Sequence, residues 1–200
     1  MRAKINIGIL ISGRGSNMEA LIRACAAPDY PARIVTVISN RSDAPGLEKA
    51  AQAGIPAIAL PQRNFASSAA FEEALHNHLI QHNVQLVCLA GFMRILSPAF
   101  VENWTERILN IHPSLLPDYP GLHPQARALA DGCRESGCSV HIVIPETDAG
   151  PVLLQRRVAL LPGDDETTLT ARILEQEHLA YPEAVRLYAQ KLLNRPAALE

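Results

Sequence analysis

The 200-residue chain lacks long hydrophobic runs. No apolar stretch approaches the roughly 20 residues that a helix needs to cross a bilayer, so the sequence predicts no membrane association. Two basic residues precede an apolar stretch at the start of the chain, as in a secretory signal peptide. However, Asn6 and Gly8 interrupt that stretch, and no small-residue cleavage site follows it. We therefore interpret residues 5–11 as a strand and expect a cytoplasmic protein.

A strong net charge and a dense set of cysteines are also missing. The chain has 18 Lys and Arg against 20 Asp and Glu, for a formal net charge of −2, and the two signs are interspersed. Such a balance provides no basic field for nucleic acid or an anionic membrane. The cysteines lack CxxC spacing, which favours reduced thiols over disulfides. They are Cys25, Cys88, Cys133 and Cys138.

Apolar residues are plentiful: they make up 48% of the chain, against 19% charged residues. This composition indicates a packed core and excludes a disordered chain. No internal repeat, low-complexity tract or linker is visible. We expect a single domain over residues 1–200, without an appended regulatory or RNA-binding domain.

Segments that are apolar nearly throughout alternate with amphipathic ones. Because parallel strands need helical crossovers, this order predicts a doubly wound, mostly parallel α/β sheet of the Rossmann-like class. The last two predicted strands have no helix between them, so we expect an antiparallel edge near the C-terminal half. Strands are predicted at 5–11, 33–39, 57–60, 86–90, 108–111, 139–144 and 152–160, and helices at 18–27, 46–53, 68–81, 98–104, 125–130 and 168–191.

Ligands of such sheets bind beyond the carboxyl ends of the strands, and the first of these ends carries a glycine-rich turn. Gly13 and Gly15 leave backbone N–H groups and the positive end of a helix dipole pointing at one spot, which suits an anion. Ser16 adds a hydroxyl and Asn17 an amide. Met18 stands where a dinucleotide fingerprint needs its last glycine. A single phosphate therefore fits better than a pyrophosphate, and a plain capped turn is the alternative.

Asn110 and His112 lie two residues apart at the end of another predicted strand, so their side chains share a face. An amide donor beside an imidazole can stabilise an oxyanion and move a proton. Asp148 lies in a glycine-containing turn, from which it could orient His112. A polar pair at the start of a loop and an ordinary turn aspartate are the alternatives.

The other histidines suggest less. His76, His78 and His82 lie on one predicted helix, but no cysteine or carboxylate cluster with ligand spacing joins them. We expect no metal site. His141 alternates with apolar residues in a predicted strand and suits either the core or a pocket. Since no cysteine has a base nearby in the sequence, we do not expect thiol catalysis.

Taken together, four segments carry a resemblance that none carries alone. They resemble the glycinamide ribonucleotide formyltransferase family, the folate-dependent transformylases of purine biosynthesis, over nearly the whole chain. The segment at 110–117 is shared with other 10-formyltetrahydrofolate enzymes, and the Gly-Ser-Asn turn points to a phosphoribosyl substrate. In chain order the segments are ISGRGSN (11–17), LAGFMRIL (89–96), NIHPSLLP (110–117) and DAGP (148–151).

The resemblance implies that the N-terminal half of the chain binds phosphate and that the C-terminal half binds folate and carries the catalytic residues. It implies 10-formyltetrahydrofolate as co-substrate, phosphoribosylglycinamide as acceptor, no metal, and a monomer or homodimer. The implied catalytic residues are Asn110, His112 and Asp148; those for the phosphate and ribose are Gly15, Ser16, Asn17 and Glu177; those for folate are Arg63, Met93, Arg94, Ile95, Leu96 and Asn110.

Three other functions stay open at this point. A formyltetrahydrofolate hydrolase would use the same triplet with water as the nucleophile, although the Gly-Ser-Asn turn counts against it. An NADP-dependent reductase could place a 2′-phosphate at residues 40–42, yet Met18 disrupts the required fingerprint. A non-catalytic nucleotide-sensing module would leave the three predicted catalytic residues unexplained.

Overall fold

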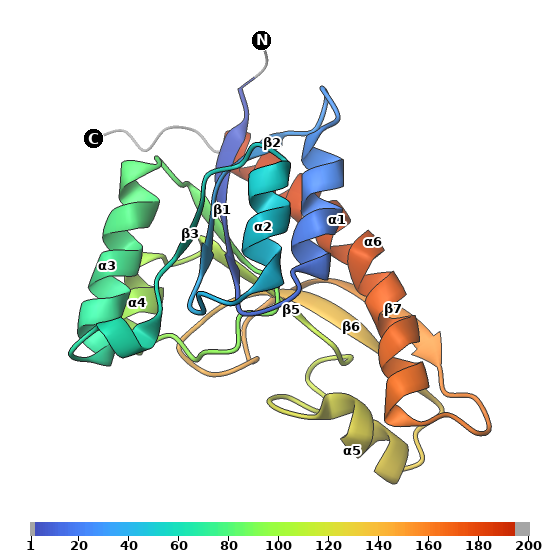
Figure 1. The fold of residues 1–200 in the computed structure, drawn as a ribbon. Helices are drawn as coiled ribbons and strands as arrows, with labels where there is room; N and C mark the ends of the chain where they lie inside the picture. Colours follow the sequence, from blue (N-terminus) through green and yellow to red (C-terminus); the bar gives the residue numbers. More distant parts are fainter. Residues whose placement is uncertain (1–2, 195–200) are drawn as a thin grey trace.

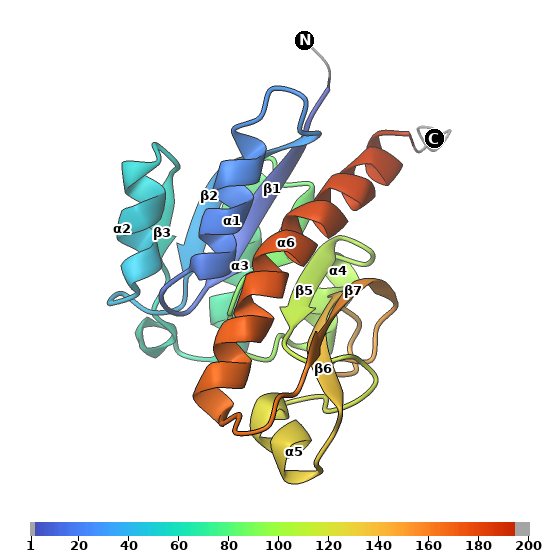
Figure 2. The same cartoon turned by 90° about the vertical axis from the view of Figure 1, so that its right-hand side faces the viewer.

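The computed structural model describes residues 3–194. Within this range the chain forms one seven-stranded sheet, in the order β3-β2-β1-β4-β5-β6-β7, with helices on both faces (Figure 1, Figure 2). The strands are β1 (Ile5–Ile11), β2 (Ala32–Ser39), β3 (Ala57–Ala59), β4 (Leu86–Leu89), β5 (Ile108–His112), β6 (Glu135–Ile142) and β7 (Val152–Ala159). The helices are α1 (Ser16–Cys25), α2 (Pro45–Gln52), α3 (Ser68–Gln81), α4 (Pro98–Asn103), α5 (Pro124–Ala130) and α6 (Glu166–Leu193), with a 3₁₀ turn η1 (Gln62–Asn64).

Strands β1 to β5 pair in parallel, whereas β6 runs antiparallel to both β5 and β7. The predicted doubly wound sheet with an antiparallel edge is thus confirmed. Strand β6 begins at Glu135, four residues before its predicted start, because Glu135–Cys138 pairs with β7 without any apolar alternation to mark it. Gly137 allows this pairing, since a Cβ there would lie 2.0 Å from the Arg156 carbonyl oxygen.

Both faces of the sheet are covered, which explains why β1 is apolar nearly throughout. Ile7, Ile9 and Ile11 pack into a core shared with α1, α2 and α6. Leu10 points the other way, into a second core with α3 and α4. Figure 2 shows α1, α2 and α6 on the near face and α3 and α4 behind the sheet.

Helix α6 crosses the sheet and fixes one wall of the site. It starts at a capping box between Asp165 and Thr168 and continues through Pro182. The Tyr181 hydroxyl contacts the main-chain oxygens of Leu89 and Leu109, at 2.9 and 3.0 Å, at the centre of the sheet. Glu177, one turn earlier, is also buried on α6.

Candidate active site

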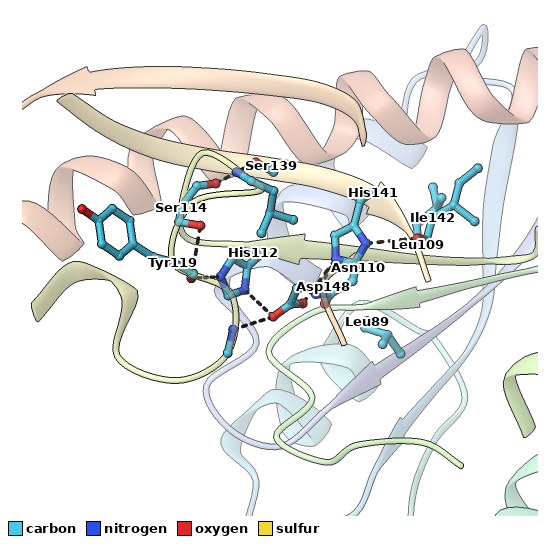
Figure 3. Close-up of polar contacts among 12 residues, drawn as sticks. Leu89, Leu109, Asn110, His112, Ser114, Tyr119, Ser139, His141, Ile142 and Asp148 are labelled. Carbon is cyan, nitrogen blue, oxygen red and sulfur yellow. Dashed lines mark hydrogen bonds and ion pairs between the residues drawn. The ribbon is translucent and has the colours of Figure 1, made fainter. Parts of the chain in front are cut away.

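The end of β5 and the facing part of β6 bring four polar side chains to one face of the sheet (Figure 3). The register pairs Asn110 with His141 and His112 with Ser139, and directly opposed residues of antiparallel strands point to the same side. The Asn110 Nδ2 atom lies 3.2 Å from His141 Nε2. His112 and His141 are 6% and 2% exposed, so this polar face is largely withdrawn from solvent.

Asp148 joins this group from the loop between β6 and β7. Its Oδ2 atom lies 3.4 Å from His112 Nδ1 and its Oδ1 atom 3.5 Å from His141 Nε2. The Gly121 N–H also donates to Oδ2, at 2.9 Å. Burial alone would raise the pKa of the Asp148 carboxyl, but the hydrogen bonds from His141 and Gly121 and the charges of the two imidazoles lower it below its ordinary value. The site therefore holds a carboxylate anion at neutral pH.

The loop reaches the site because its backbone lies directly against β6. Since β6 is antiparallel, the loop starts beside the amino end of β5 and folds back toward Asn110. A Cβ at Gly150 would lie 1.8 Å from the Ile142 carbonyl oxygen, and the Ile142 N–H donates to the Pro151 oxygen at 2.9 Å. Asp148 itself has φ 53°, a left-handed conformation that aspartate tolerates better than most residues. Glycine is thus required two residues after the carboxylate.

Both ring nitrogens of His112 face hydrogen-bond acceptors. Nδ1 faces Asp148, and Nε2 lies 2.9 Å from the main-chain oxygen of Tyr119. A carboxylate and a carbonyl can only accept, so the two contacts are satisfied together only when both nitrogens carry hydrogen. Ser114 holds the intervening loop in place, since its hydroxyl donates to the Asp118 oxygen at 2.6 Å. The arrangement therefore offers an acceptor to each ring nitrogen of His112.

His141, which the sequence left open between core and pocket, lies in the site. Its Nδ1 atom faces the Ile142 oxygen at 3.0 Å, so this nitrogen carries hydrogen. Nε2 can then accept from Asn110 when the ring is neutral or donate to Asp148 when it is protonated. The hairpin register opposite Asn110 is the signal that identifies this residue, and the sequence does not reveal it because the true start of β6 has no pattern.

The glycine-rich turn forms as the sequence predicts. Gly15 adopts φ 72° as the N-cap of α1, and the helix begins at Ser16, two residues earlier than expected. The first N–H groups of a helix have no acceptors within it, so those at Ser16 and Asn17 point outward from the helix end. Strands β1 and β5 are separated by β4 alone, so the axes of these two strands lie about 10 Å apart.

Asn17 and Glu177 meet at the wall formed by α1 and α6. The Asn17 amide Nδ2 donates to Glu177 Oε2 at 2.6 Å. Burial raises the pKa of the Glu177 carboxyl to about 7, opposed by the hydrogen bond from Asn17. Within residues 3–194, the buried Asn17 Oδ1 atom has no hydrogen-bond partner. An unsatisfied buried acceptor beside a carboxyl group is suited to a ligand that brings hydroxyl or amine donors.

The segment after β4 presents apolar side chains. Met93 and Ile95 are 74% and 76% exposed, whereas Leu96 is buried. The Arg94 guanidinium stacks over the Phe71 ring on α3, 4.5 Å from its centroid. Arg63 is exposed in η1, on the segment that leads into α3. The exposed apolar pair and the nearby main chain are available to a flat heterocycle.

Other candidate chemistry is weak. Among residues 3–194, no group of three or more His, Cys, Asp or Glu side chains could hold a metal ion, and no helix there is long and apolar enough to cross a membrane. His76 accepts from the Trp104 indole and His78 contacts Thr36. All four cysteines are free, and burial raises the pKa of the Cys25 thiol to about 12, which disfavours the reactive thiolate.

A Rossmann-like sheet with a histidine–aspartate pair at a strand end is typical of α/β enzymes. The chain belongs to the formyl transferase family, whose sequence profile matches residues 5–185. This result sets aside the reductase interpretation.

Two relatives show how much of the family the chain spans. It is 48% identical to a phosphoribosylglycinamide formyltransferase from Escherichia coli, over 95% of this chain and 90% of that protein. It is 50% identical to a trifunctional purine biosynthetic protein adenosine-3 from Drosophila pseudoobscura pseudoobscura, over 94% of this chain but only 14% of that protein. The chain thus corresponds to about one seventh of the larger relative.

A solved structure supports the assignment of the chain to this family. The crystal structure of glycinamide ribonucleotide transformylase 1 from Symbiobacterium toebii superposes with a TM-score of 0.92 at 46% identity, covering 94% of this chain and 89% of that one. Such agreement extends the match from the sequence segments to the whole arrangement of strands and helices.

Proposed function

We propose that this protein transfers the formyl group of 10-formyltetrahydrofolate to the amine of phosphoribosylglycinamide, giving formylglycinamide ribonucleotide and tetrahydrofolate, a step of purine biosynthesis. The observation that carries the proposal is the position of the Asp148 carboxylate, 3.4 Å from His112 Nδ1, on the face of the sheet that also presents Asn110. We infer further that the working form is a cytoplasmic monomer or homodimer with small-molecule substrates only.

The proposed reaction is a direct acyl transfer. The substrate amine attacks the formyl carbon, the C–N10 bond of the folate breaks, and the amine proton ends on N10. Negative charge develops on the formyl oxygen during attack, and Asn110 Nδ2–H and protonated His112 stabilise it. Asp148 holds the imidazolium in orientation and assists the proton exchange.

The loop over His112 has a consequence for this mechanism. The Nε2–H group of His112 is engaged by the Tyr119 oxygen, so it is not free for a second acceptor in the same direction. We infer that substrate binding draws the Tyr119 carbonyl away and frees the donor for the formyl oxygen. His141 lies beside the same groups. Asn110 donates either to His141 or to the substrate, and the Asp148 carboxylate is shared between the imidazoles of His112 and His141.

The two substrates are assigned to opposite sides of this group. The N–H groups and hydroxyl at Gly15, Ser16 and Asn17 suit the 5′-phosphate, and Glu177 together with the unsatisfied Asn17 Oδ1 suits the ribose and glycinamide end. The folate pterin is assigned to the exposed segment after β4. We infer that its residues, Met93, Arg94, Ile95 and Leu96, contact folate largely through backbone groups, and that Arg63 and Asn110 contribute from the flanks.

An assay of the purified protein with 10-formyltetrahydrofolate tests the proposal, with release of tetrahydrofolate followed in the presence and absence of phosphoribosylglycinamide. We expect release only with the acceptor, together with a stoichiometric formylated product. Equal release without the acceptor would indicate the hydrolase instead, because water would then be the nucleophile. Ligand binding without any turnover would indicate a sensing module.

A further inference from the structure

A buried serine connects the two proposed substrate subsites. The Ser12 hydroxyl accepts a hydrogen bond from the Met93 N–H at 2.8 Å and donates one to Asn40 Oδ1 at 2.6 Å. The Ser12 N–H also donates to the Gly91 oxygen, at 3.1 Å. Ser12 is only 6% exposed. Ser12, which follows β1, therefore bonds to the segments that follow both neighbouring strands, β2 and β4.

These bonds join functionally different segments. Ser12 leads directly into the glycine-rich turn at residues 13–17, where we place the phosphate. Met93 lies in residues 91–97, which we name the folate loop because the pterin is assigned there. The hydrogen bonds of Ser12 thus set the distance between the phosphate turn and the start of the folate loop.

The far end of the folate loop is held independently. The Glu72 carboxylate accepts from the Ser97 N–H at 2.9 Å and also from the Ser97 hydroxyl. Glu72 is itself buried, on α3. Between the two anchors, the side chains of Met93 and Ile95 are exposed. The loop is therefore fixed at both ends, and only the first anchor connects it to the phosphate turn.

We propose that Ser12 is a positioning residue for formyl transfer: its hydroxyl holds the folate loop in register with the phosphate turn, so that the formyl carbon and the attacking amine meet. The inference rests on the proposed function. A hydroxyl is suited to this role because it donates and accepts at once. Alanine at this position leaves the Met93 N–H and Asn40 Oδ1 without partners, and a shift of about 1 Å between reacting groups can cost about 10²-fold in rate.

Ser12→Ala is compared with the wild type by calorimetric titration with tetrahydrofolate, by amide exchange of Met93 in NMR spectra, and by formyl-transfer kinetics. We expect the Kd for tetrahydrofolate to rise about tenfold, equivalent to about 1.4 kcal/mol, and Met93 exchange to accelerate. The kcat falls, because the formyl carbon is displaced, while the KM for phosphoribosylglycinamide changes less than about twofold since the turn keeps its N–H groups.

Ser39→Ala is the matched control. Ser39 is a fully buried serine at the end of β2 whose hydroxyl accepts from the Arg41 N–H at 3.0 Å, within its own segment. We expect a comparable fall in melting temperature but unchanged tetrahydrofolate affinity and Met93 exchange. Should Ser12→Ala not fold, Asn40→Ala replaces it, because it frees the Ser12 hydroxyl to rotate and should raise the same Kd about threefold.

The outcomes separate this inference from the function on which it rests. A Ser12→Ala protein that only melts earlier, with wild-type tetrahydrofolate affinity and Met93 exchange, overturns the positioning role and leaves the proposed function intact. A wild type that neither binds tetrahydrofolate nor transfers a formyl group overturns both.

Discussion

At the scale of single residues, the proposed site depends on side chains whose surroundings differ from those of ordinary surface groups. Asp148 stays ionised although half-buried, whereas burial raises the pKa of Glu177 to about 7. Two differences act together: Glu177 is more deeply buried than Asp148, and two imidazoles and an N–H group face Asp148, whereas among residues 3–194 only Asn17 bonds to the Glu177 carboxyl. The Asp148 and Glu177 carboxyl groups therefore differ in their protonation near neutral pH.

Replacing Asn110 by alanine removes one of the two donors assigned to the formyl oxygen. We expect the kcat to fall about 10²- to 10³-fold, as for other lost oxyanion donors, with the KM for phosphoribosylglycinamide little changed. Steady-state kinetics at saturating concentrations of both substrates measure this. A kcat within a few-fold of the wild type would exclude Asn110 from oxyanion stabilisation.

Ser16→Ala removes a hydroxyl from the proposed phosphate turn and leaves the folate loop untouched. We expect the KM for phosphoribosylglycinamide to rise about tenfold, which corresponds to one hydrogen bond to a charged group, and the KM for folate to stay the same. Separate measurements of the KM for phosphoribosylglycinamide and the KM for folate test this expectation. A parallel rise of both would argue against phosphate binding at this turn.

Asn110, His112 and Asp148 could be recognised from the sequence because each lies at a strand end or in a glycine-containing turn. The meeting of Asp148 with His112 could not, since it depends on how a loop folds back over an antiparallel strand. His141 stayed open between core and pocket for the same reason, because its position opposite Asn110 depends on the register of the strands. Register follows from pairing along the whole hairpin, and the polar start of β6 hides it.

At the scale of secondary structure elements, most of the sheet could be predicted because buried parallel strands are apolar nearly throughout. Helix α3 begins after Ser67, which accepts from the Ala70 N–H as a typical N-cap. The 3₁₀ turn η1 carries no periodic pattern and was not predicted. The predicted boundaries of elements were wrong where small or polar residues form regular structure through tertiary contacts, as at the start of β6.

The loop between β6 and β7 gives a test at this scale. Gly150→Ala forces the loop away from the Ile142 oxygen, because the added Cβ would lie 1.8 Å from it. We expect a loss of stability of about 1–3 kcal/mol from this overlap and a drop in kcat, since Asp148 moves with the loop. Urea unfolding and steady-state kinetics check the two effects. Ala149→Ser, at the exposed neighbouring position, should retain both, and a fully active Gly150→Ala would show that the loop does not position Asp148.

At the scale of the whole molecule, helix α6 and the two cores hold segments distant in sequence against one another. Glu177 reaches Asn17 across 160 residues of chain. In the folded state the pKa of the Glu177 carboxyl is about 7, whereas its ordinary value is 4.5. Between these pH values the native protein binds more protons than the unfolded chain, so this group makes stability fall as the pH rises from about 4.5 to about 7.

Glu177→Gln removes this titration and keeps the shape of the side chain. We expect the free energy of unfolding of the wild type to fall more steeply between pH 5 and pH 8 than that of the variant, the difference being about 1 kcal/mol or more. Urea denaturation of both proteins at the two pH values gives this double difference. Parallel changes in the two proteins would mean that Glu177 titrates normally.

The central claim is that Asp148 acts through His112 on the formyl group being transferred. The most direct measurement is the kcat for formyl transfer by Asp148→Asn, compared with Asp43→Asn, which changes an exposed aspartate paired with Arg41. We predict that Asp148→Asn loses about 10²-fold or more, within the range of general acid–base effects, while Asp43→Asn keeps the wild-type rate. A folded Asp148→Asn protein with near-wild-type kcat would contradict the account.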